Sequence, residues 1–138
     1  MPDTAPGGIR PIEHGLAGYV RAVAAAVGVP AEATVFEISD TATAYLGLAQ
    51  RWDQRPAEDL MLVWDEHHGW RIAVETDPGV PPTVVDHLGG TDLVPEPQIV
   101  AGFVSDVLAA RRPARSRPVG LTVGSRDQLA ARLSHYRV

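Results

Sequence analysis

The alternation of apolar and polar positions is strongest in residues 59–76, which read DLMLVWDEHHGWRIAVET. Two runs in this stretch, 59–65 and 70–76, are rich in strand-forming residues and flank a short polar turn that ends in Gly69. Runs of this kind on either side of a glycine-containing turn are typical of a β-hairpin. The pattern therefore predicts two antiparallel strands, and this hairpin is the best-specified element of the chain.

The turn chemistry predicts how these two strands pair. A three-residue loop over 67–69, with a left-handed glycine at its end, sets Trp64 against Ile72 and leaves the turn histidines exposed. The same register sets Asp65 against Arg71 as a cross-strand ion pair. A register one residue tighter would divide the apolar side chains between the two faces. The favoured register places six of them on one buried face: Leu60, Leu62, Trp64, Trp70, Ile72 and Val74.

Two further strands are predicted upstream of the hairpin. Residues 33–39 are rich in strand formers, and residues 43–49 alternate apolar with polar or small side chains. Because the connections are short, consecutive strands are expected to be neighbours in one antiparallel meander. Residues 83–88 fit either a short strand or a helical turn, and the pattern leaves both alternatives open.

Apolar residues at spacings of three and four predict two long amphipathic helices, over 11–27 and 97–110. The outer face of the first helix is mostly alanine and glycine, which permits close approach by another helix or by a second subunit. A capping box at 125–128, S-x-x-Q, predicts a short terminal helix that continues to about Tyr136.

The order of the predicted elements is α-β-β-β-β-α, followed by the short terminal helix. Helices on one face of an antiparallel sheet define the α+β class. We therefore expect a four-stranded antiparallel meander covered on one face by an N-terminal and a C-terminal helix. Residues 9–110 are expected to form this single domain, and residues 111–138 a basic linker with the short C-terminal helix.

Composition and charge narrow the class of protein. The 138 residues include no cysteine, so neither a disulfide framework nor a thiolate metal site is expected. No apolar run approaches the length of a membrane span and no signal peptide is recognisable, so the expected location is cytoplasmic. The net charge of −5 is unevenly distributed. Residues 1–110 carry five arginines against sixteen acids, whereas residues 111–138 carry seven arginines against one acid.

The polar hairpin turn is one candidate place for chemistry. Residues 65–68, DEHH, combine carboxylates with imidazoles, which can bind a divalent metal or transfer protons. Adjacent residues on a tight turn diverge, however, and the motifs H-x-x-x-H and H-E-x-x-H are absent. A solvated polar turn is therefore the favoured interpretation. The sequence predicts no catalytic residue, no metal site and no cofactor.

The polar loop 50–58 supplies the candidate protein-binding residues, Arg51, Trp52 and Arg55. Tryptophan and arginine are the residue types favoured at the energetic centre of protein interfaces. The open alternative is that Trp52 folds over the sheet edge as part of the core, because tryptophan is highly buried on average.

A basic run in the C-terminal segment is the second candidate surface. Its four arginines are Arg111, Arg112, Arg115 and Arg117. Runs of this kind can dock on phosphate groups, which favours nucleic-acid binding. Against this, the acidic body would repel a duplex, and no helix-turn-helix is recognisable. The competing interpretation is that the basic tail, residues 111–138, docks on the acidic body of its own chain or of a neighbouring subunit.

Three segments carry a resemblance to known proteins: GLAGYVRAVAAAVGV, DLMLVWDEHHGWRIAVE and PEPQIVAGFVSDVLA. Over residues 15–110 the chain resembles a family of small actinobacterial proteins classed as a domain of unknown function. The resemblance implies no activity, because none is established for that family. The order of elements is also similar to YbjN-like proteins and type III secretion chaperone-like domains, an analogy of fold that does not fix function.

Together these observations predict a noncatalytic protein-binding module, chaperone-like or regulatory, with an unknown protein partner and a homodimeric state. The alternative is a nucleic-acid-associated regulator that uses the C-terminal arginines. A small enzyme or ligand-binding domain ranks third, because it requires a convergent His/Asp/Glu pocket. No membrane partner is expected.

Overall fold

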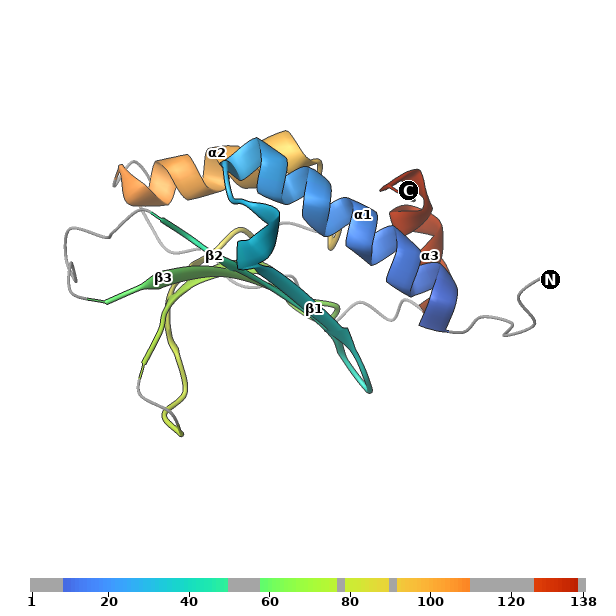
Figure 1. Cartoon of the computed structure of the whole chain (residues 1–138), viewed down its shortest axis with the longest axis horizontal. Coiled ribbons are helices and arrows are strands. Elements are labelled where there is room, and N and C mark those ends of the chain that lie inside the picture. Colours follow the sequence, from blue (N-terminus) through green and yellow to red (C-terminus); the bar gives the residue numbers. More distant parts are fainter. Residues whose placement is uncertain (1–8, 50–57, 77–78, 90–91, 110–125, 137–138) are drawn as a thin grey trace.

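Five antiparallel strands follow one another along the chain and lie in the same order in one sheet (Figure 1). The computed structural model describes residues 9–49, 58–76, 79–89, 92–109 and 126–136. The strands are β1 (Thr34–Ile38), β2 (Ala42–Gly47), β3 (Leu60–Asp65), β4 (Gly69–Val74) and β5 (Thr83–His87). Because each strand pairs with its neighbour in the chain, β1 and β5 form the two edges of this sheet.

Two long helices, α1 (Ile9–Val27) and α2 (Pro97–Leu108), lie over the same face of the sheet (Figure 1). A short 3-10 helix, η1 (Ala31–Ala33), leads from α1 into β1. Near the end of the chain, α3 (Arg126–Leu133) continues into a second 3-10 helix, η2 (Ser134–Tyr136). The helices thus cover one side of an antiparallel sheet, which confirms the predicted α+β class.

The prediction of four strands is wrong, because Thr83–His87 pair with β4 as a fifth. The register between β4 and β5 shifts at Ile72/Ala73, so Val85 has no direct partner. A bulge of this kind puts one extra residue into the strand and interrupts the alternation of faces. Val85 and Asp86 are consequently both buried, although they are adjacent. The interrupted alternation explains why this segment does not read clearly as a strand.

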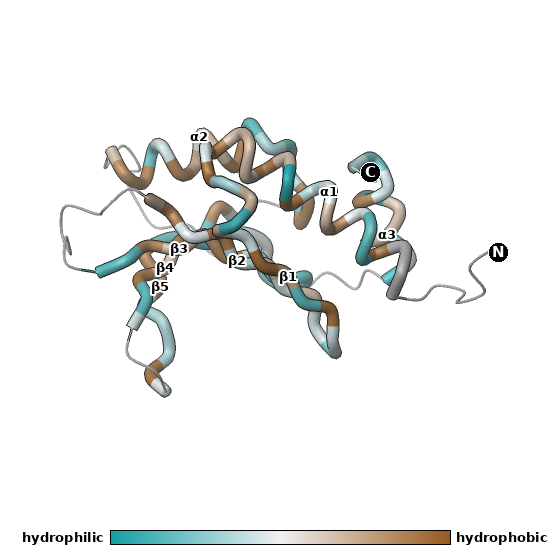
Figure 2. Tube along the Cα trace, viewed as in Figure 1, coloured by the Kyte–Doolittle hydropathy of each residue, from teal (hydrophilic) through white to brown (hydrophobic). Residues whose placement is uncertain are grey.

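The core lies between the sheet and the helices, and Figure 2 shows apolar segments in the strands and in both long helices. Trp64 and Trp70 are almost fully buried at its centre, with exposed fractions of 0% and 1%, while the turn histidines are exposed. The predicted inner face of the hairpin is therefore confirmed. Trp64 Nε1 donates to the carbonyl of Leu93 at 2.7 Å, so its polar edge is satisfied although buried.

Tyr19 links α1 to both the sheet and the segment before α2. Its hydroxyl accepts a hydrogen bond from Trp70 Nε1 at 3.0 Å and donates one to the carbonyl of Pro95. Burial raises the pKa of Tyr19 well above its ordinary value near 10, so the hydroxyl keeps the proton that it donates. One side chain of α1 thereby fixes the position of two other parts of the fold.

The hairpin register differs from the prediction by two residues, since Trp64 pairs with Trp70 and Asp65 with Gly69. The predicted left-handed glycine is present, with φ of 75° at Gly69. Glu66 does not pair with β4, because it extends the pairing of β3 with β2. Its N–H donates to the carbonyl of Ala42 at 3.1 Å, and its Oε1 accepts from the Ala42 N–H at 2.7 Å. A shift of two residues preserves the faces, so the buried set is unchanged.

The C-terminal helix α3 docks on the first half of α1 (Figure 1). Leu133 is fully buried beside Gly15, where a Cβ would lie only 2.6 Å from the Leu133 Cβ. Arg126 forms a hydrogen-bonded ion pair with Glu66 at 2.7 Å, and Arg132 forms another with Asp92 at 2.8 Å. Apolar packing and two ion pairs therefore attach α3 to the rest of the fold.

Candidate functional site

The hairpin turn is organised around the carboxylate of Asp65, a residue that is only 7% exposed. Its Oδ1 accepts the backbone N–H groups of His67 and His68, both at 2.8 Å. Its Oδ2 accepts from Arg71 Nη1 at 2.7 Å, and the Nδ1 of His68 lies 3.0 Å from Oδ1. The predicted ion pair with Arg71 is confirmed, although the two residues lie diagonally on neighbouring strands rather than opposite one another.

The surroundings of Asp65 lower its pKa below the ordinary value near 4. Burial acts in the opposite direction and raises the pKa, but the N–H of His67 and the guanidinium of Arg71 outweigh it. A carboxylate whose pKa is lower in the folded than in the unfolded state stabilises the fold at pH values above its unfolded pKa. This contribution is lost as the pH falls toward the folded pKa.

Replacing Asp65 with asparagine is expected to lower the free energy of unfolding by about 1–2 kcal/mol at neutral pH, because the amide cannot neutralise Arg71. The loss should shrink as the pH falls below about 4, where the native carboxylate also loses its advantage. Urea titrations at pH 7 and at several acidic pH values measure both effects. Asp40→Asn, at an exposed aspartate between β1 and β2, is the control. A loss of unfolding free energy in Asp65→Asn that does not vary with pH would contradict the lowered pKa of Asp65.

Both carboxylates of the turn, Asp65 and Glu66, make contacts that stabilise the fold. Asp65 binds the turn and Arg71, and Glu66 binds Ala42 of β2 and Arg126 of α3. Across the described parts of the chain, no three His, Asp or Glu side chains converge in a way that could hold a metal ion. The geometry therefore supports the interpretation of residues 65–68 as a hydrogen-bonded polar turn.

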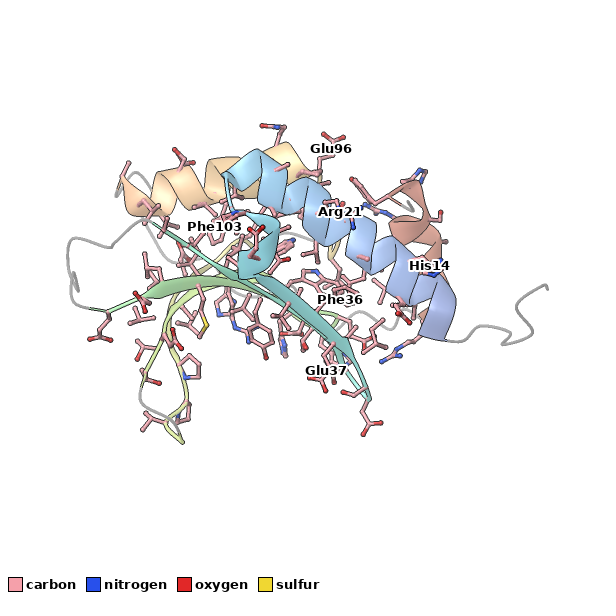
Figure 3. The ribbon with its side chains drawn as sticks, viewed as in Figure 1. His14, Arg21, Phe36, Glu37, Glu96 and Phe103 are labelled. Atoms are coloured by element: carbon pink, nitrogen blue, oxygen red, sulfur yellow. The ribbon has the colours of Figure 1, made fainter. Side chains whose placement is uncertain are left out.

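A groove between α1 and the edge strand β1 is the second candidate site. It has a volume of about 390 Å³. Eight of the residues that line it are apolar or small. They are Ala17, Val20, Ala24 and Ala25 of α1, Val29 and Ala31 of the connection, and Thr34 and Phe36 of β1. Alanine side chains are too short to fill the space between helix and strand, so the groove stays hollow. Its rim carries a positive charge, because the exposed Arg21 also lines it (Figure 3).

Strand β1 presents a regular edge beside this groove. Its pairing with β2 has no irregularity over five residues, and no described strand pairs with its other side. Val35 is 61% exposed and lies beside Tyr45, on the face that α1 and α2 leave uncovered. The opposite edge, β5, is interrupted by its bulge and follows Pro81 and Pro82, features that discourage further pairing. Strand β1 itself, Thr34–Ile38, contains neither a bulge nor a proline.

The sequence-predicted binding residues cannot be compared with this groove. Arg51, Trp52 and Arg55 lie outside the described residues, and so do the four arginines of the C-terminal run: Arg111, Arg112, Arg115 and Arg117. Both predictions therefore stay predictions.

Sequence reasoning missed the groove, although two of its signals were present. The alanine-rich face of the first helix was recognised as a surface for close approach, and α3 uses that kind of contact at Gly15. The first strand of the meander, over residues 33–39, is predicted as well. What the pattern did not reveal is that α1 lies beside β1 with a hollow between them, because this depends on the placement of the helix on the sheet.

Fold and site together define a small α+β protein with helices on one face of its sheet and an open strand edge. The chain belongs to a family of unknown function, DUF6292, whose model matches residues 19–106. This confirms the predicted membership of a domain-of-unknown-function family. Comparison with curated proteins gave no match, and neither did comparison with solved structures. In the part of the chain that the structure describes, no helix combines the length and apolar character needed to cross a membrane.

Proposed function

We propose that this protein is a noncatalytic protein-binding module with a chaperone-like or regulatory role. An extended segment of a partner protein adds to the sheet along β1 and places alternate side chains in the groove beside α1. The observation that carries the proposal is the regular edge of β1, with which no second described strand pairs, next to a hollow apolar groove.

Binding by strand addition would use both the regular backbone edge of β1 and the groove beside it. Backbone hydrogen bonds to β1 supply affinity, and the groove supplies selectivity, because every second residue of an added strand faces the helices. The inward-facing residues of β1, Thr34, Phe36 and Ile38, are only half-buried. An added strand would cover them further, and removing apolar surface from water favours binding.

Replacing Ala25 with tryptophan is expected to block binding at the groove. Ala25 is exposed at the rim, so the indole can occupy the groove without entering the core, and thermal stability should change little. A photo-crosslinking residue at Glu37, an exposed position of β1, should capture a protein partner in the native host. We expect that product to disappear in the Ala25→Trp variant.

Two controls make this experiment specific. Gln98→Trp places the same side chain on an exposed position of α2, away from β1, and should leave the product unchanged. A crosslinker at Thr83, on the opposite edge of the sheet, should not form the crosslinked product with this partner. Capture of the same protein from both edges, or its persistence in Ala25→Trp, would contradict the proposal.

A further inference from the structure

We infer that the segment bound along β1 carries a bulky apolar side chain and, two residues later, a carboxylate, and that Arg21 binds this carboxylate. The inference rests on the proposed function and deepens it, because it states the chemistry of the partner. Three observations carry it: the pairing state of Arg21, the hollow beside it and the alternation of side chains in an added strand.

Arg21 differs from the other arginines whose side chains the structure describes. Arg71, Arg126 and Arg132 each bind a carboxylate, at 2.7, 2.7 and 2.8 Å respectively. Arg21 has no carboxylate partner among the described residues, and it is exposed at the rim of the groove. A guanidinium presents a planar set of donors that matches a carboxylate, and such charge-assisted hydrogen bonds are stronger than neutral ones.

The hollow beside Arg21 has room for a large apolar side chain. Its volume of about 390 Å³ exceeds the roughly 150 Å³ of an apolar cavity known to accommodate benzene. The walls next to Arg21 are formed by short or apolar side chains of α1, among them Ala17, Val20 and Ala24. When a bound segment covers the groove and excludes water, these apolar walls reduce the screening of a charge pair at Arg21.

The alternation of side chains along a β-strand sets the spacing between the apolar side chain and the carboxylate of the partner segment. Residues i and i+2 of an added strand face the same side, about 7 Å apart. Arg21 and Phe36 line the same groove from opposite sides, from α1 and from β1 (Figure 3). If residue i of the added strand is apolar and packs on Phe36, residue i+2 also faces the helices. Residue i+2 then lies within reach of the long side chain of Arg21. The expected recognition element is apolar-x-acidic.

Charge also decides between a partner of this kind and a second copy of the chain. A two-fold pairing of β1 with its own copy around Phe36 would bring two Arg21 side chains toward each other across the new interface. Like charges in that arrangement repel. A carboxylate from a different protein neutralises Arg21 instead, so we assign the groove to an acidic-apolar segment.

Fluorescence anisotropy of labelled ten-residue peptides with the full chain tests the inference. The peptides alternate threonine with apolar residues and carry leucine at position i with Asp, Asn or Lys at i+2. We expect the Asp peptide to bind about tenfold more tightly than the Asn peptide, which corresponds to one charge-assisted hydrogen bond. This preference should weaken as salt is raised, and Arg21→Gln should abolish it.

Matched variants separate recognition by Arg21 from a general charge effect. Gln98→Glu changes the net charge by the same amount as Arg21→Gln but lies away from β1, so it should retain the preference for Asp. Arg21→Glu should invert it and favour the Lys peptide. Thermal stability of every variant is measured in parallel, because Arg21 is exposed and its replacement should not unfold the protein.

The outcomes distinguish the inference from the function on which it rests. Equal binding of the Asp and Asn peptides, both blocked by Ala25→Trp, would overturn the role of Arg21 and leave the binding module intact. Binding of no peptide at all would contradict the proposed function itself. A dimer in sedimentation experiments that Ala25→Trp dissociates would assign the groove to a second copy and overturn the inference.

Discussion

Replacing Trp70 with alanine is expected to lower the free energy of unfolding by about 3–5 kcal/mol. The side chain is 1% exposed and packs between Trp64 and Tyr19, with ring centroids 6.5 and 6.0 Å apart. Its removal leaves a cavity at the centre of the core. It also removes the donor that Trp70 Nε1 supplies to the Tyr19 hydroxyl.

Urea denaturation followed by circular dichroism measures this loss without relying on tryptophan fluorescence. Tyr45→Ala is the matched control, because it removes an aromatic ring from the uncovered face of the same sheet, where the ring is 41% exposed. That change should cost about 1 kcal/mol or less. Similar losses for the two variants would contradict the placement of Trp70 in the core.

Replacing Gly15 with alanine is expected to destabilise the protein by about 1–3 kcal/mol, although alanine favours a helix by about 1 kcal/mol over glycine. The new Cβ would lie 2.6 Å from the Cβ and 2.8 Å from the carbonyl oxygen of Leu133, so α3 must move away from α1. The free energy of unfolding should fall, and amide hydrogen exchange in α3 should accelerate.

The same substitution at Gly102 should have the opposite sign. Gly102 lies in α2 with nothing within 4 Å of a Cβ, so Gly102→Ala should stabilise the protein by about 0.5–1 kcal/mol. The pair isolates close packing from helix propensity, since both positions gain the same methyl group in a helix. Stabilisation by both substitutions would show that α3 does not dock at Gly15.

The inner face of the sheet could be predicted from the sequence because side chains alternate between the two faces of a strand. The six predicted inner positions of the hairpin and those of the preceding strand, Ala44 and Leu46, are all buried as expected. Helix positions were predictable for the same reason, and α1 and α2 lie within two residues of the predicted bounds. Patterns of this kind depend only on which side of an element faces the core.

The hairpin register could not be derived from that alternation, because a shift of two residues preserves both faces. The register depends instead on the hydrogen bonds of the turn. Asp65 accepts the N–H groups of His67 and His68, which begins the turn one residue earlier than predicted, and Glu66 pairs with Ala42 of β2. Contacts with a third strand are not visible in the sequence of a two-stranded hairpin.

The groove and the particular residues that attach α3 escaped prediction for a related reason. Arg126 was counted as part of a basic C-terminal segment, whereas the structure places it in an ion pair with Glu66, 60 positions earlier in the chain. The significance of Arg21 lies in having no carboxylate partner among the described residues, a property that its sequence position does not reveal. Whether an arginine has an ion-pair partner depends on how elements that are distant in the sequence pack together.

The long reach of α1 has a consequence for the path of folding. The strands of the meander pair with their chain neighbours, so they close short loops. Tyr19 of α1 instead reaches Pro95, 76 positions away, and the entropy of closing such a loop is larger. The sheet is therefore expected to assemble first and the helices to dock on it later. During that interval both faces of the sheet are open, and refolding yield should fall as the protein concentration rises.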